Sequence, residues 1–316
     1  MLTRTLAIRL AGVLVILLLI SFLTFSLVYL APGDVVKNLL GTRPSTPEAI
    51  AQIRAQYHLD DPFLVRYLDW LWGVLRGDFG TSIRLRQPVT VAIGSRMGNT
   101  ATLALLAFAI AAVTAIPLGI LSAAREGRRS DRILSALALL GLSAPSFALA
   151  ILLLYLFAML IPIFPVYGGG SGALDTLWHL VLPAVALAAG IGAILQRITR
   201  AAVLRELQSD ATTFARARGI GEREVRRIAL RSALIPIVTG AGLILTFIVG
   251  GTIIVETVFA LPGIGSLLQE AVFFKDLPVV QAVTLLVAAI IAVITIAVDL
   301  SYLALDPRVR TKELSR

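Results

Sequence analysis

Long apolar segments alternate with polar ones along the whole chain. A helix needs about 20 predominantly apolar residues to cross the roughly 30 Å hydrocarbon layer of a bilayer. Six segments are long enough: 8–30, 100–123, 133–161, 178–198, 235–255 and 279–303. The pattern therefore predicts an all-α membrane protein with six transmembrane helices. We interpret the first segment as an uncleaved span, because residues 29–31 lack the small-x-small pattern of a signal-peptide cleavage site.

Basic residues concentrate in alternate polar segments. Together with Arg9 and Arg197 at the adjoining span ends, the segments before the first span, between spans two and three, between spans four and five, and after the sixth span hold 19 basic and 8 acidic residues. Apart from Glu256 at the end of span five, the other polar segments hold 9 of each. Because lysine and arginine are enriched in cytoplasmic loops, both termini are expected in the cytoplasm. This distribution accounts for the net charge of +9 without a nucleic-acid partner.

Several aromatic residues lie in the polar segment after the first span. Phe63, Tyr67 and Trp70 follow one another at helical spacing. Tyrosine and tryptophan favour the membrane boundary, because one end of each side chain is apolar and the other polar. We expect an amphipathic helix lying against the outer membrane surface or on the next spans; a small cap that only packs is the alternative.

Several spans contain helix-breaking or small residues. Prolines 117, 145, 183 and 236 each free a carbonyl group, which a membrane protein tolerates where neighbours or water satisfy it. Ser143 and Ser146 flank Pro145, and their hydroxyls either line a water-filled pathway or cap the chain locally. The glycines at positions 240, 242, 250 and 251 predict close helix packing in span five.

Two acidic residues, Glu256 and Asp299, lie at span ends. Acidic residues inside membranes are costly and usually functional. Their terminal positions favour structural roles, although Glu256 stays a candidate for a translocation pathway. No acidic residue is expected at the centre of a span, which argues against a proton-coupled carrier.

The polar segment 197–239 separates spans four and five and carries nine arginines and four acidic residues. Ser209 and Asp210 are suited to cap a short helix over 211–218, which Gly219 would end. A second helix would run from Glu222 towards Pro236. The first helix would place Ala211, Phe214, Ala215 and Arg218 on one face. Such a face fits a groove on another protein; a solvated loop that only fixes topology is the alternative.

The stretches 213–219 and 230–236 in this segment resemble the coupling loop of bacterial ABC importer permeases, most closely the dipeptide and oligopeptide branch. The glutamate that names this loop in other branches is absent. Further matches occur in order along nearly the whole chain: Pro32-Gly33-Asp34, Leu59 to Pro62, Arg76 to Ser82, Val255 to Phe259, Pro262 to Gly265, Val298 to Tyr302 and Leu305 to Arg308. The resemblance implies a type I importer permease in which the coupling residues are Asp210, Ala211, Phe214, Ala215, Arg216, Ala217, Arg218 and Gly219.

The resemblance also implies an assembly in a bacterial plasma membrane. Its expected partners are a homologous second permease, two cytoplasmic ATPases, an extracytoplasmic substrate-binding protein and membrane lipid. Peptides are the expected cargo, with nickel, glutathione and haem as alternatives. The implied organisation is residues 1–97 as a first span with an extracytoplasmic segment, 98–307 as a five-helix core with a coupling loop at 199–232, and 308–316 as a cytoplasmic tail.

The sequence argues against several kinds of chemistry in the chain itself. A Walker A loop needs a Gly-Lys pair to hold phosphates, and none occurs. We therefore expect no cofactor here and no enzyme activity, with ATP and Mg²⁺ on partner ATPases. Cysteine is absent, which excludes thiolate metal sites, and no metal site is expected. Ser171 in a Gly-rich loop and His179 resemble part of a rhomboid protease motif, but both lie in or beside one outer loop. A secondary transporter would need an inverted repeat and a central ionisable site, and the sequence has neither.

Overall fold

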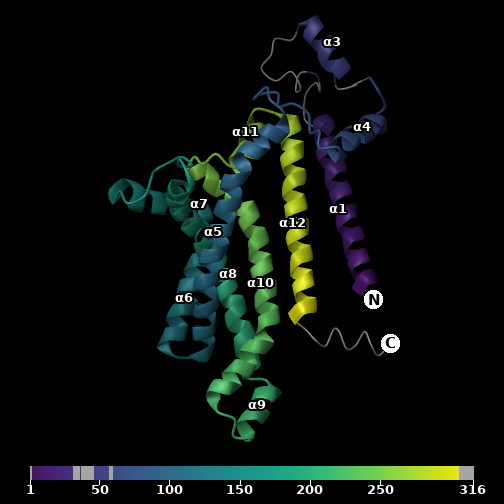
Figure 1. Cartoon of the computed structure of the whole chain (residues 1–316). Helices are drawn as coiled ribbons and strands as arrows, with labels where there is room; N and C mark the ends of the chain where they lie inside the picture. The colour runs from purple at the N-terminus through teal and green to yellow at the C-terminus, as the bar shows by residue number, and fades with distance from the viewer. Residues whose placement is uncertain (1, 31–35, 37–45, 57–59, 306–316) are drawn as a thin grey trace. The chain divides into compact units, whose positions relative to one another are not determined.

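The computed structural model describes residues 2–30, 36, 46–56 and 60–305 (Figure 1). Regular secondary structure in these residues is helical, apart from one β-bridge between Thr81 and Pro88. In chain order the helices are α1 (Leu2–Leu30), α3 (Pro47–Gln56), α4 (Phe63–Leu75), α5 (Val89–Ala124), α6 (Arg129–Ser143), α7 (Ser146–Leu154), the π-helix η1 (Tyr155–Leu160), α8 (Ala173–Leu207), α9 (Asp210–Ala217), α10 (Glu222–Val258), α11 (Ile264–Phe273) and α12 (Leu277–Leu305). The motif Pro32-Gly33-Asp34 and the tail 308–316 lie outside the described residues.

The long helices agree with the expected membrane architecture. α1, α5, α8, α10 and α12 are long and apolar enough to span a membrane, and the bent pair formed by α6 with α7 and η1 makes six when it is counted as one broken span. This confirms the prediction of an all-α membrane protein with six transmembrane helices.

The third span is not the single helix expected from the sequence over 133–161. Its two halves meet at 98°, with extended backbone at Ala144 and Pro145. A residue that precedes proline avoids the helical region, and the ring of Pro145 cannot continue the helix before it. Prolines 117, 183 and 236 instead lie inside continuous helices, so of the four prolines only Pro145 breaks its span.

The described residues form two compact units. The first takes in residues up to Thr100 together with Pro262–Ala292. In it, α4 packs on α1: the Tyr67 hydroxyl lies 2.7 Å from the Ser21 hydroxyl, and the Tyr67 ring meets Phe22 and Phe25 edge-on. The amphipathic helix expected around Phe63 and Trp70 is thus present, but it rests on the first span and not on the next spans.

A second contact in this unit joins the loop before α5 to the loop before α12. The carboxylate of Asp276 accepts a hydrogen bond from the Ser82 hydroxyl and from the backbone N–H groups of Ile83 and Arg84, each at 3.1 Å. In the same unit, buried apolar residues of α5, α11 and α12 form one core cluster: Val89, Ala92, Ile264, Leu267, Ala271, Val279, Ala282 and Val283.

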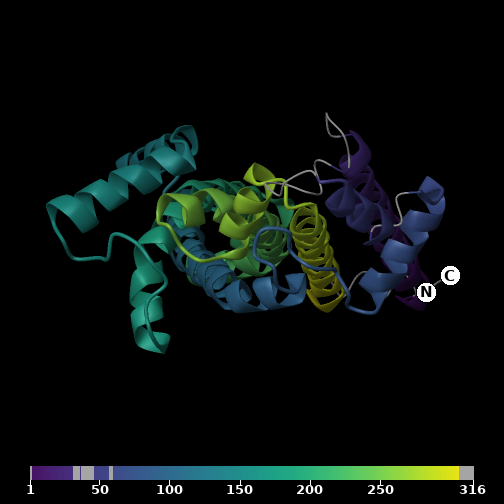
Figure 2. The same cartoon turned by 90° about the horizontal axis from the view of Figure 1, so that it is seen from above.

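The second unit takes in Ala101–Leu261 and the residues from Val293 onward. Its α8 lies beside α10 (Figure 1, Figure 2). The glycines of α10 explain how closely its neighbours approach: a Cβ atom at Gly240 would lie 2.9 Å from Ile198, one at Gly251 would lie 2.7 Å from Leu187, and one at Gly242 would overlap Val298. Small residues therefore set the packing of this helix, as the sequence predicts. Gly250 differs, since a Cβ there meets open space among the described residues.

Candidate functional site

The short helix α9 lies at the turn between α8 and α10 (Figure 1). Ser209 is its N-cap and accepts a hydrogen bond from the backbone N–H of Thr212, while Asp210 sits in the first turn, where a negative charge favours the helix dipole. The helix ends before Gly219, whose φ of +76° is in the left-handed region that glycine adopts easily. The expected helix is therefore present, one residue earlier than predicted.

The two faces of α9 differ in exposure. Phe214 is 70% exposed, and Ala211 and Arg218 are also exposed. Ala215 differs from the expectation, because it is buried together with Thr212. These two residues are three positions apart and so share the inward face. The outward face consequently presents Phe214 with Ala211 and Arg218, without Ala215.

Two side chains attach α9 to the long helices on either side. The Thr212 hydroxyl lies 3.0 Å from the carbonyl oxygens of both Glu206 and Leu207, which belong to the last turn of α8, where carbonyl groups lack intrahelical partners. Arg216 donates from Nη1 to the Leu207 carbonyl at 3.0 Å and from Nε to the Glu222 carboxylate at 2.7 Å. Arg216 thus connects the end of α8 with the start of α10. The sequence did not single out Thr212, whose role depends on which face is buried.

A second polar cluster joins α5, α6 and α8. The buried carboxylate of Asp131 accepts hydrogen bonds from Nε and Nη2 of Arg200, at 2.7 and 2.9 Å, from the Ser122 hydroxyl at 2.5 Å and from the backbone N–H of Gly127 at 3.0 Å. A two-point arginine–carboxylate pair fixes geometry as well as charge. The sequence placed Asp131 and Arg200 in separate basic segments and gave no sign that they meet.

The residues expected in a translocation pathway occupy different surroundings. Ser143 is exposed and donates to the Leu139 carbonyl at 2.9 Å. Pro145 is exposed and Ser146, the first residue of α7, is half-buried. Glu256 is only 1% exposed and lies in the last turn of α10, at the span end where the sequence placed it. A pathway through these four residues stays a prediction.

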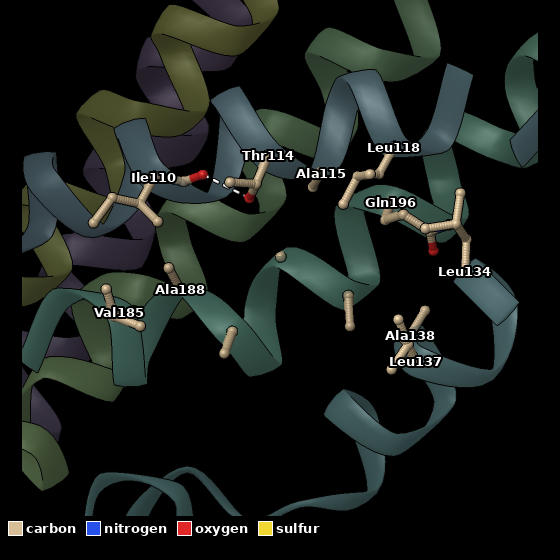
Figure 3. Close-up of a pocket in the computed structure, with 13 residues that line it drawn as sticks. Ile110, Thr114, Ala115, Leu118, Leu134, Leu137, Ala138, Val185, Ala188 and Gln196 are labelled. Atoms are coloured by element: carbon tan, nitrogen blue, oxygen red, sulfur yellow. Dashed lines mark hydrogen bonds between the residues drawn. The ribbon is translucent and has the colours of Figure 1, made fainter. Parts of the chain in front are cut away.

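A cavity of about 300 Å³ lies between α5, α6 and α8 (Figure 3). Its lining is almost entirely apolar: Ile110, Thr114, Ala115, Leu118, Leu134, Leu137, Ala138, Val185, Ala188, Ala189, Gly192, Ala193 and Gln196. The Thr114 hydroxyl bonds to the Ile110 carbonyl at 2.7 Å. Gln196 is 4% exposed, and neither atom of its amide has a hydrogen-bond partner in the described part of the chain.

The serine and histidine of the outer loop do not form a catalytic pair in the described residues. Ser171 donates its backbone N–H to the Asp175 carboxylate at 2.6 Å, and Nδ1 of His179 lies 2.9 Å from the Asp175 carbonyl. The described residues also hold no group of three or more histidine, aspartate or glutamate side chains placed to bind a metal ion.

Comparisons with known proteins agree over nearly the whole chain. The profile of the family described as binding-protein-dependent transport system inner membrane component matches residues 115–311, and that of the corresponding N-terminal membrane component matches residues 1–104. A putative peptide transport system permease protein of Brucella melitensis is 38% identical over 98% of this chain and 99% of its own length. A glutathione transport system permease protein of Salmonella choleraesuis is 37% identical over 96% and 98%.

A solved structure supports the fold independently. The inward-facing MetNI methionine ABC transporter has a chain that superposes with a TM-score of 0.58, covering 69% of this chain and 97% of that one, at 20% identity. At this identity the likeness speaks for the fold alone.

Proposed function

Because the chain belongs to the family of binding-protein-dependent transport system inner membrane components, we propose that it is a permease subunit of an ATP-driven peptide importer. It forms half of the translocation pathway beside a homologous second permease. Two cytoplasmic ATPases hydrolyse ATP, an extracytoplasmic binding protein delivers the cargo, and both termini lie in the cytoplasm. The relatives described as peptide and glutathione transport permeases support a peptide cargo.

The observation that carries the mechanism is the attachment of α9 at both ends. An exposed aromatic side chain on a short helix fits the groove of a partner protein, and Phe214 is such a side chain. Because Thr212 and Arg216 bind α9 to the end of α8 and the start of α10, a displacement of α9 by the ATPase moves both long helices. The Asp131–Arg200 pair passes the movement of α8 to α6.

Glutathione is the second candidate cargo, because the Salmonella relative carries that description at almost the same identity as the peptide permease. Glutathione is itself a tripeptide, so the same pathway chemistry serves both. The binding protein rather than the spans separates the two candidates.

Affinity purification of the tagged chain in mild detergent, followed by mass spectrometry, tests this assembly. We expect to recover a second permease, ATPases and a binding protein, and binding assays on that protein with dipeptides, oligopeptides and glutathione name the cargo. Recovery of the chain alone, active in liposomes without ATP, would overturn the importer and favour a secondary transporter.

A further inference from the structure

The cavity between α5, α6 and α8 combines an apolar groove with one unsatisfied polar end. Along α8 it follows Val185 to Gln196, which corresponds to about 17 Å of helix at 1.5 Å per residue. Small residues of α8, among them Ala189, Gly192 and Ala193, leave the space. At the far end lies the amide of Gln196 (Figure 3), which is buried with its donor and acceptor both unpaired.

An unpaired buried amide costs about 1–3 kcal/mol, so the occupant of this cavity is expected to bond to it. Water cannot fill the groove, because an ordered water needs two to four polar partners and the remaining lining has no free polar side chain among the described residues. A peptide with charged termini is equally unsuited, since no charged residue lines the cavity and an unpaired buried charge is very costly.

A basic segment lies at the polar end of the groove. Arginines 125, 128, 129 and 132 are all exposed, and they lead directly into the part of α6 that lines the cavity with Leu134, Leu137 and Ala138. Exposed arginines next to a membrane-spanning helix attract anionic lipid headgroups, each contributing about 1 kcal/mol. The groove is therefore apolar along most of its length, can form hydrogen bonds at the Gln196 amide, and lies next to positively charged arginines.

We propose that this cavity is a binding site for an anionic phospholipid. One acyl chain lies in the groove along α8, an ester carbonyl of the lipid accepts a hydrogen bond from the Gln196 amide, and the phosphate lies near the arginines that precede α6. A helix of the second permease is the competing occupant, but its backbone carbonyls are already paired within the helix, so it would need a polar side chain opposite Gln196.

The test uses the purified transporter complex in vesicles that contain phosphatidylglycerol or phosphatidylcholine, each with a photoreactive diazirine on one acyl chain. Labelled residues are mapped by mass spectrometry. We expect labelling to concentrate on the cavity segments of α5, α6 and α8, with a preference for phosphatidylglycerol of about five- to ten-fold, the contribution of a single arginine near the phosphate.

Two variants and a matched control make the result specific. Ala189 is an exposed residue that lines the cavity, and Ala189→Leu fills the groove and is expected to abolish the localised labelling. Ala201→Leu alters an exposed alanine of the same helix that does not line it, and should leave labelling unchanged. Gln196→Leu is expected to lower labelling about five-fold through loss of one hydrogen bond, without lowering the melting temperature.

Labelling spread evenly over the apolar faces, equal labelling by the two lipids, or equal effects of Ala189→Leu and Ala201→Leu would each overturn the proposal. Crosslinking of the Ala189→Cys variant to the second permease, in place of lipid, would also overturn the proposal. None of these readouts requires transport, so the lipid site and the import function fail or succeed separately.

Discussion

Asp131 and Arg200 are 69 residues apart in the chain and form a two-point ion pair. The carboxylate is almost completely buried and the guanidinium is partly exposed. Because the hydroxyl of Ser122 and the backbone of Gly127 bind the same carboxylate, one side chain connects three helices of the second unit: α5, α6 and α8.

Replacement of Asp131 by asparagine is expected to lower the free energy of unfolding by about 1.5–3 kcal/mol, the usual contribution of a hydrogen bond to a charged group. The melting temperature of the purified protein in detergent measures this effect. The double variant Asp131→Asn/Arg200→Gln should lose less than the sum of the single variants, since the two residues interact directly. Additive losses would contradict a direct pair.

Phe214 is expected to affect transport without affecting stability. Its side chain is 70% exposed, so Phe214→Ala removes little internal packing. If it occupies a groove on the ATPase, truncation costs 2 kcal/mol or more, about a thirty-fold loss of affinity. Peptide-stimulated ATP hydrolysis and uptake in proteoliposomes should fall accordingly.

The control for Phe214 is Thr213→Ala, because Thr213 is an exposed neighbour whose hydroxyl donates to the carbonyl of Ser209, the N-cap of the same helix. This variant should retain most activity. Equal losses in the two variants would mean that α9 is sensitive to any change and that Phe214 has no special contact.

Arg216 tests whether α9 must be attached to both long helices. Arg216→Gln removes its bonds to Leu207 and Glu222 and should leave ATP hydrolysis present but uncoupled from peptide uptake. Its effect on stability should be small, since the pair is exposed.

The matched control is Arg227→Gln, which removes an exposed pair with Glu224 within one helix. Uptake per ATP hydrolysed should stay at the wild-type value in this variant. A similar drop in that ratio for both arginine variants would rule out a role for the α8–α10 connection.

Two glycines of α10, Gly242 and Gly250, allow a controlled test of how closely this helix packs. A Cβ atom at Gly242 would overlap Val298, whereas one at Gly250 meets open space. Gly242→Ala should destabilise the protein by about 1–3 kcal/mol through overpacking, while Gly250→Ala should be neutral or stabilising by up to about 1 kcal/mol because alanine is the better helix former. Melting temperatures that shift together would contradict the packing of α10.

Local patterns were sufficient to predict the spans and α9. Apolar length identifies a span because the bilayer fixes the length that is needed, and Ser209 and Gly219 mark the ends of α9 because capping depends on adjacent residues. The four prolines show the limit of such reasoning: each removes the same backbone donor, yet only Pro145 breaks its helix.

The features that could not be predicted from the sequence depend on contacts between helices. The Asp131–Arg200 pair and the cavity at Gln196 depend on how α5, α6 and α8 meet, which no spacing along the chain encodes. Ala215 was expected on the outward face of α9, but the neighbouring helices bury it. Glu256 lies at the end of α10, as expected, but its 1% exposure results from packing that the sequence does not show.

The most direct test of the account asks which face of α9 touches the ATPase. The chain contains no cysteine, so a single introduced cysteine is its unique thiol and can carry a short photocrosslinker in the assembled complex. With Phe214→Cys or Ala211→Cys, we expect ATP-dependent crosslinks to an ATPase subunit, whereas Ala215→Cys, on the buried face, should give few. An intact complex in which Phe214→Cys forms no ATPase crosslink, or in which all three positions crosslink equally, would contradict the role assigned to α9.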